Sequence, residues 1–125
     1  MLRKLGFSMM AVIALSLVAI AQGGKTTLEG YIIDKACATG KVAKKPDPQA
    51  AAADEPTSCA LMDTCLKSGL GIYADGKYTE FDEKGKTLAK AALEKSKKDK
   101  GAKFKVTGHV AEGHFVASKI EEAAE

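Results

Sequence analysis

The sequence predicts a mainly β domain, a small five-stranded barrel of the OB type with one helix between its third and fourth strands. Three observations support this fold class. Five short runs alternate apolar with polar positions or are rich in β-branched and aromatic residues, at 26–34, 70–74, 77–81, 103–110 and 114–120. An Asp-Gly pair joins the second and third runs, and a lysine-rich stretch with helical spacing separates the third from the fourth. An open α+β sheet with the helix on one face would give the same order, so both architectures remain open.

Residues 1–21 predict an export signal that is removed from the mature chain. Arg3 and Lys4 form a basic head, an apolar run follows, and residues 19–21 supply the small side chains of a cleavage site. We therefore expect residues 22–125 to form a single periplasmic or secreted domain with no membrane span. This mature chain is nearly neutral, which argues against nucleic acid as a partner.

The first strand, 26–34, is followed by a segment of very different composition. Residues 38–57 contain all three prolines, four consecutive alanines and few large apolar side chains. Such a segment buries little surface to offset the entropy cost of ordering it, so we predict a flexible loop. A short cysteine-bearing helix is expected next, over 59–67, with Ser58 as its N-cap and Gly69 at its end.

Residues 70–81 predict a β-hairpin with a two-residue turn, because Asp and Gly both tolerate the positive φ angles of that turn. In this register Tyr73 lies opposite Tyr78 on the face that points away from the core. Tyr31 of the first strand can share the same face. OB domains receive oligomeric ligands over strands two and three, so these three tyrosines form a candidate ligand-binding platform; the alternative is plain cross-strand packing.

Residues 87–98 predict an amphipathic surface helix that lacks glycine and proline. The helical spacing is carried by Leu88, Ala91 and Ala92, and four lysines lie elsewhere in the segment. Lysine-rich runs of this kind are usually solvated helix faces.

The last two strands predict a hairpin with a three-residue turn that ends at Gly113. This register pairs Val110 with His114, turns His109 outward and turns His114 inward. We prefer it to a two-residue turn, which would place Lys119 opposite Val106. It puts one set of apolar residues on the core face: Phe104, Val106, Val110, Val116 and Ile120.

Three stretches of the chain resemble a family of small exported bacterial proteins with an OB-like domain and no established activity. They are GYIIDKAC (30–37), CLKSGLGIY (65–73) and FKVTGHVAEGHFVASKI (104–120). Together they cover 34 of the 84 residues outside the leader and the proline-rich segment. The resemblance implies an OB-like fold and export, and it implies no particular chemistry.

The chain has three cysteines, Cys37, Cys59 and Cys65, and an odd number leaves one thiol without a bonding partner. If Cys59 and Cys65 share one helix, about 9 Å of axial rise separates them, which is too far for a disulfide. We therefore expect Cys37 to bond with either Cys59 or Cys65 in an oxidising compartment. Two alternatives remain: a reactive thiol at Cys59 near a helix N-terminus, or a set of three soft ligands for Cu(I) or Zn(II).

These patterns favour a non-enzymatic binding or adaptor module of the cell envelope, with one structural disulfide, no cofactor, and an unknown envelope ligand or protein as its partner. The alternative function is a thiol-based redox or Cu/Zn-handling protein that uses the three cysteines. The chain has no phosphate-binding loop, HExxH stretch or serine nucleophile motif. It also lacks a CxxC pair, which argues against a thioredoxin-like oxidoreductase.

Overall fold

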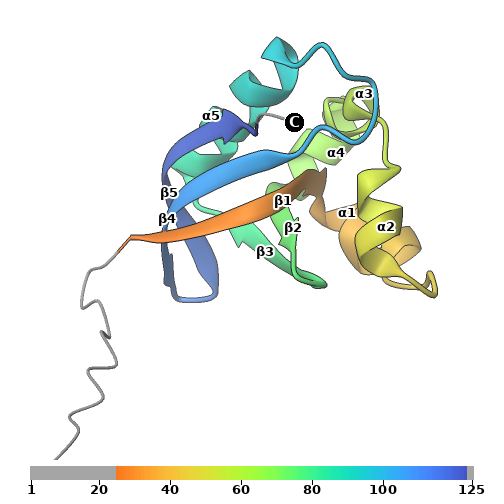
Figure 1. The fold of residues 1–125 in the computed structure, drawn as a ribbon, viewed down its shortest axis with the longest axis horizontal. Coiled ribbons are helices and arrows are strands. Elements are labelled where there is room, and N and C mark those ends of the chain that lie inside the picture. Colours follow the sequence, from red (N-terminus) through yellow and green to blue (C-terminus); the bar gives the residue numbers. More distant parts are fainter. Residues whose placement is uncertain (1–24, 124–125) are drawn as a thin grey trace, which may run out of the picture.

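The computed structural model describes residues 25–123, so the predicted export signal at 1–21 lies outside the described residues. Five strands form one mixed sheet that closes in a ring, in the order β1-β2-β3-β5-β4 (Figure 1). They are β1 (Thr26–Asp34), β2 (Leu70–Ala74), β3 (Lys77–Phe81), β4 (Phe104–Ala111) and β5 (His114–Glu122). The β3–β5 pair is parallel and the other pairs are antiparallel. Among the described residues, no helix has the length and hydrophobicity needed to cross a bilayer.

Strand β1 closes the ring because its two halves pair with different neighbours. Residues 26–30 pair with β4 and residues 31–34 pair with β2. Gly30 lies where the partner changes, and a Cβ atom there would collide with the Tyr73 carbonyl oxygen. Glycine therefore allows β1 and β2 to approach closely at the bend.

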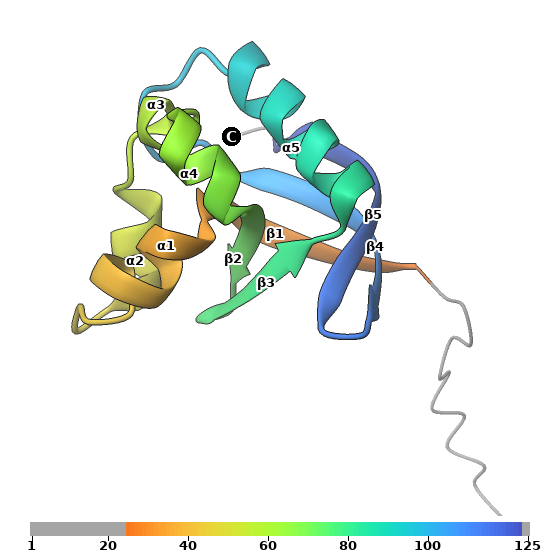
Figure 2. The same cartoon turned by 180° about the vertical axis from the view of Figure 1, so that it is seen from behind.

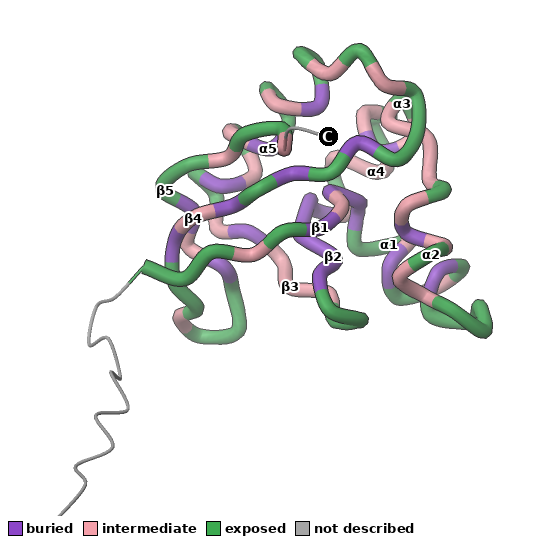
Figure 3. Tube along the Cα trace, viewed as in Figure 1, coloured by how far each residue is buried: buried purple, intermediate pink, exposed green. Residues whose placement is uncertain are grey.

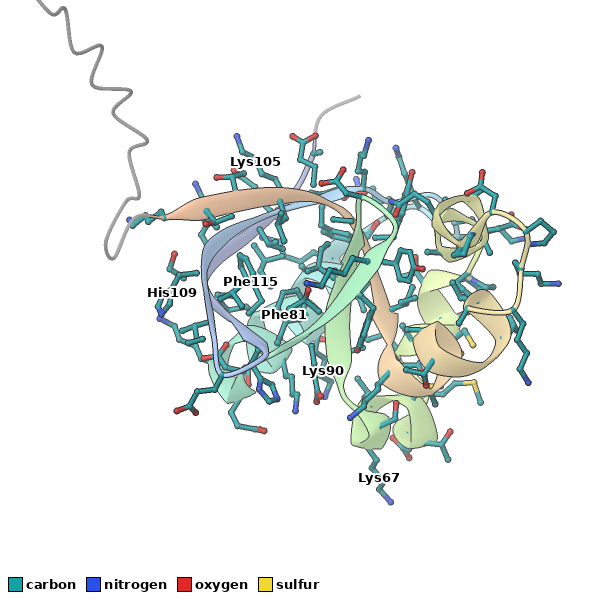
Figure 4. All side chains as sticks on the ribbon, turned by 90° about the horizontal axis from the view of Figure 1, so that it is seen from below. Lys67, Phe81, Lys90, Lys105, His109 and Phe115 are labelled. Atoms are coloured by element: carbon teal, nitrogen blue, oxygen red, sulfur yellow. The ribbon has the colours of Figure 1, made fainter. Side chains whose placement is uncertain are left out.

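The hydrophobic core fills the inside of the ring. Phe81 and Phe115 meet edge-to-face, with ring centroids 6.2 Å apart, and both lie in the interior of the sheet (Figure 4). Buried stretches run along the strands around this interior (Figure 3). Further fully buried members of the core are Leu70, Ile72, Phe104 and Val106.

Helix α5 (Glu83–Lys95) lies between β3 and β4 in the chain and covers one end of the ring (Figure 2). It begins earlier than the predicted start at residue 87, because the Asp82 carboxylate accepts the Gly85 N–H at 2.9 Å and caps the helix. The buried positions are Gly85, Ala89 and Leu93. Of the predicted apolar positions Leu88, Ala91 and Ala92, only Ala92 packs against the core, and it is partly buried. The earlier start of α5 explains part of the difference between the predicted and the observed buried positions. Packing against the sheet determines which face of α5 is buried.

The first hairpin confirms the predicted register. Ala74 pairs with Lys77 and Tyr73 pairs with Tyr78 across a two-residue turn. Asp75 and Gly76 have positive φ angles of 52° and 74°, as that turn requires.

The second hairpin differs from the prediction. Ala111 pairs with His114, so the turn has two residues and not three, and a register shift between Thr107 and Gly108 brings Val106 opposite Ile120. Because of this shift, the two-residue turn no longer places Lys119 opposite Val106, which was the reason for preferring a longer turn. In the sequence, a glycine inside a strand is the sign of such a shift. The predicted core face is therefore wrong at Val110 and Val116. Val110 is 59% exposed, and the buried residues of β5 are Phe115 and Ala117 instead of Val116.

The segment predicted as a flexible loop contains helices that pack on the sheet. A one-turn helix α1 (Lys35–Cys37) continues into a π-helical turn η1 (Ala38–Val42), followed by α2 (Pro48–Ala53). Two further short helices, α3 (Thr57–Ala60) and α4 (Asp63–Ser68), lead into β2. The small buried side chains Ala38, Val42 and Ala52 pack against Ile33 and Tyr73 on the outer face of the sheet. The prediction failed because it counted only large apolar residues as core.

Candidate functional site

The three cysteines converge although they are up to 28 positions apart in the sequence. Cys37 ends α1, Cys59 lies in α3 and Cys65 lies in α4, and their three Sγ atoms are all within 4.8 Å of one another. Each cysteine is partly buried. Among residues 25–123, they are the one group of three or more histidine, cysteine or acidic side chains close enough to share a metal ion.

Cys59 and Cys65 meet because the chain between them is not one helix. Helix α3 ends at Ala60, Met62 has the extended angles φ −65° and ψ 144°, and α4 begins at Asp63. The predicted single helix over 59–67 is therefore wrong, and the axial separation of Cys59 and Cys65 inferred from it does not apply. Ala60 and the partly buried Leu66 pack on the main core, and the break between the helices allows both to reach it.

Asp34 connects two of the cysteine-bearing helices. It is the last residue of β1, it is only 1% exposed, and its Oδ2 accepts the Cys37 backbone N–H at 3.0 Å. The Ser68 hydroxyl lies 3.3 Å from the same oxygen and 2.8 Å from the Cys65 carbonyl oxygen. One buried carboxylate thus positions α1 against α4. The sequence analysis missed Asp34, although an Asp three residues before Cys37 was a possible capping signal.

Helix α3 is fixed from another direction. The Thr57 backbone N–H donates to the Asp99 carbonyl oxygen at 2.7 Å, and the Thr57 hydroxyl donates to the Lys98 carbonyl oxygen at 2.9 Å. These bonds attach the start of α3, and with it Cys59, to the chain that follows α5. The cysteine site is therefore held both by the end of β1, which precedes it in the chain, and by the segment after α5, which follows it.

Burial and nearby carboxylates oppose ionisation of two of the three thiols, Cys37 and Cys65. Burial raises the pKa of Cys37 to about 12, with further contributions from a hydrogen bond to Asp34 and from the charges of Asp34 and Glu55. Burial and the charge of Asp34 also raise the pKa of Cys65. Both thiols therefore keep their protons at neutral pH unless a positive charge is placed beside them.

Glu55 is one of these carboxylates. Its Oε1 accepts from Lys41 Nζ at 2.8 Å, and its side chain is 8% exposed. The other oxygen, Oε2, is buried with no hydrogen-bond partner in the part of the chain that the structure describes. The hydrogen bond to Glu55 raises the pKa of Lys41, so that lysine stays charged at neutral pH.

The predicted disulfide would join Cys37 to Cys59 or Cys65. In the structure all three cysteines are free, with no pair at bonding distance. The geometry brings both predicted partners close to Cys37, and the bond itself stays a prediction.

The three tyrosines share one face of the sheet, as the register requires, but this face is not open. Tyr73 pairs with both Tyr31 and Tyr78 and is 5% exposed, because the segment containing η1 and α2 packs over it. The Tyr73 and Tyr78 ring centroids are 6.5 Å apart. Burial, followed by the charge of Glu80, raises the pKa of Tyr78. The expectation of an exposed tyrosine pair is therefore wrong for Tyr73.

The two histidines lie away from the cysteines. His109 is on the opposite side of the molecule from the helices that carry the sulfur atoms (Figure 4). His114, predicted to point inward, is exposed, and its Nε2 lies 3.8 Å from Glu80 Oε1. The shorter turn of the second hairpin reverses the side on which His114 lies. Neither histidine belongs to the three-cysteine group.

Comparison with protein-family models, with curated proteins and with solved structures finds no match for this chain. The resemblance to small exported OB-like proteins therefore stays a prediction from the sequence.

Proposed function

We propose that this protein binds one thiophilic metal ion, Cu(I) or Zn(II), through Cys37, Cys59 and Cys65. The observation that carries the proposal is the mutual approach of the three sulfur atoms to within 4.8 Å. Three thiolates that each lie about 2.3 Å from one ion are separated from each other by roughly 4 Å. Only small side-chain rotations separate the described arrangement from that ligand set. Thiolates are the ligands that these soft ions prefer.

The charges around Cys37 and Cys65 support a metal site over a reactive thiol at either of these two residues. A nucleophilic cysteine needs surroundings that stabilise its thiolate, such as a nearby cation or a long helix N-terminus. Here burial and Asp34 oppose ionisation of Cys37 and Cys65. A bound cation reverses this, because its charge compensates both the thiolates and the neighbouring carboxylates. A dithiol–disulfide redox pair would also use only two of the three sulfur atoms, whereas a metal ion can bind all three.

The fold gives the site a rigid support. We propose that the closed sheet is an OB-type barrel, which the strand order β1-β2-β3-β5-β4 and the position of α5 between β3 and β4 support. The cysteine-bearing helices α1, α3 and α4 gather at one side of it (Figures 1 and 2). With the predicted export signal, the proposed role is metal handling in the cell envelope. The binding module with a tyrosine platform has less support, because Tyr73 is covered.

The test is a competition titration of the reduced mature chain, under anaerobic conditions, against chromophoric chelators for Cu(I) and Zn(II). We expect one ion per chain, with each of the variants Cys37→Ser, Cys59→Ser and Cys65→Ser weakening binding by at least about tenfold. Ser58→Ala is the matched control, because Ser58 is exposed and adjacent to Cys59. Equal affinity of the wild type and all three cysteine variants would contradict the proposal.

A further inference from the structure

Met62, which lies between Cys59 and Cys65 in the sequence, has an unusually exposed side chain. Met62 is 56% exposed, and the only other exposed large hydrophobic residue among those described is Val110 in a distant hairpin. Its apolar neighbours Leu61 and Leu66 pack against the main core. Core packing therefore accounts for Leu61 and Leu66 but not for Met62.

The backbone holds Met62 in the link between the two helices that carry Cys59 and Cys65. Its N–H donates to the Cys59 carbonyl oxygen at 3.2 Å, and its own carbonyl oxygen accepts the Leu66 N–H at 2.9 Å. Met62 thus belongs to the same hydrogen-bonded unit as the two cysteines. The methionine side chain has three rotatable bonds, so its sulfur can move without a change in the backbone.

The donor set of the site leaves a place for one more soft ligand. No histidine or carboxylate among the described residues joins the three cysteines within sharing distance of an ion. The Asp34 carboxylate is outside this group, and its Oδ2 already accepts from the Cys37 N–H and the Ser68 hydroxyl. A thioether is a good ligand for Cu(I), whereas Zn(II) takes thiolate, imidazole or carboxylate as its fourth ligand.

We infer that Met62 supplies a thioether sulfur as the fourth donor to the three-cysteine site and makes the site selective for Cu(I) over Zn(II). This inference rests on the proposed function, since it requires the thiolates to bind an ion. Approach from the solvent side suits an exposed side chain, which covers the ion once the ion is bound. The site then consists of three anionic sulfurs and one neutral sulfur.

The experiment compares Met62→Leu with the wild type in the same chelator titrations. Leucine keeps the apolar character and removes the sulfur. We expect the affinity for Cu(I) to fall about tenfold or more and the affinity for Zn(II) to stay the same. A second variant, Met62→His, tests the same position with a ligand that Zn(II) prefers. An imidazole as the fourth ligand, beside the three thiolates, should tighten Zn(II) binding by about tenfold or more.

The outcomes separate this inference from the proposed function. If the wild type binds neither ion, both fail. If Cu(I) binding depends on the three cysteines but Met62→Leu binds Cu(I) as tightly as the wild type, only the role of Met62 is overturned. If Met62→Leu lowers the affinity for Cu(I) and for Zn(II) equally, Met62 has a structural role and its role as a Cu(I) ligand is overturned. Thermal melting of each metal-free variant checks that the fold is kept.

Discussion

The Asp34 carboxylate accepts the backbone N–H of Cys37 at 3.0 Å while its own side chain is almost fully buried. This contact starts α1 at the end of β1 and places Cys37 beside α4. The same carboxylate acts on the Cys37 thiol, where its hydrogen bond and its charge both oppose loss of the proton. Asp34 therefore positions the site and also sets its charge.

Replacement of Asp34 by Asn should make Cys37 more reactive in the metal-free protein. The amide oxygen can still cap α1, but the negative charge is lost, so the pKa of Cys37 should fall from about 12 while burial keeps it above the ordinary value. A lower pKa means more thiolate at a given pH and faster alkylation. Alkylation rates of the reduced protein, measured against pH with peptide mapping, report the change.

The matched control for this variant is Asp47→Asn. Asp47 also caps a helix, with its Oδ1 accepting the Ala50 N–H at 3.1 Å, but the helix is α2. Alkylation of Cys37 should be unchanged in this control. Equal alkylation of Asp34→Asn and the wild type at every pH would show that Asp34 does not influence the thiol.

Metal binding should tighten as the pH rises. The raised pKa values mean that Cys37 and Cys65 are protonated at neutral pH, so the ion must displace their protons. Each displaced proton increases the apparent affinity by about tenfold per pH unit. Titrations between about pH 6.5 and pH 8.5 should therefore show a steep rise, and Cys37→Ser should reduce the slope by about one proton. An affinity independent of pH would mean that no thiol proton is released.

Gly30→Ala should destabilise the fold. The new Cβ would meet the Tyr73 carbonyl oxygen where β1 changes partner from β4 to β2. Overpacking against backbone costs about 1–3 kcal/mol of unfolding free energy, which urea denaturation measures. Gly40→Ala is the control, because a Cβ at Gly40 meets nothing within 4 Å and its stability should be nearly unchanged. A similar loss in both variants would refute the steric explanation.

Glu80→Gln should lower stability at neutral pH and have no such effect in acid. Glu80 lies 2.9 Å from Lys86 Nζ and 3.5 Å from Lys35 Nζ, and the hydrogen bond to Lys86 lowers the pKa of Glu80. A carboxyl group with a lowered pKa stabilises the fold above its unfolded pKa, and this is lost as the pH falls through the folded pKa.

We expect the Glu80 variant to lose about 1 kcal/mol of unfolding free energy at pH 7, as for partly exposed ion pairs. The difference from the wild type should shrink towards about pH 2, as the Glu80 carboxyl group becomes protonated below its lowered pKa. Urea denaturation at the two pH values measures it. The ion-pair account fails if the two differences are the same.

The strands were predictable because their signals are local. β1 matches the predicted range, and the Asp-Gly turn fixes the register of β2 and β3. The second hairpin was not predictable in the same way, because the register shift between Thr107 and Gly108 compensates for a shorter turn. A single glycine within a strand indicates such a shift only weakly.

The cysteine cluster could not be predicted from spacing. A spacing of six positions from Cys59 to Cys65 suggests separation along a helix, and only tertiary packing of Ala60 and Leu66 shows that the helix is broken. The role of Asp34 depends on how β1 ends beside α4, which is a long-range contact. The three cysteines were named as candidate ligands, but their convergence became visible only in the folded chain.

The most direct test of the three-cysteine metal site is the number of thiols that one bound ion protects. The reduced mature chain is loaded with one equivalent of Cu(I) or, in parallel, Zn(II), treated with an alkylating reagent and weighed by intact mass spectrometry after removal of the ion. We expect all three cysteines to be protected by at least one of the two ions and all three to be alkylated in the metal-free control. Alkylation of all three cysteines in the Cu(I)-loaded and the Zn(II)-loaded protein alike would contradict the account.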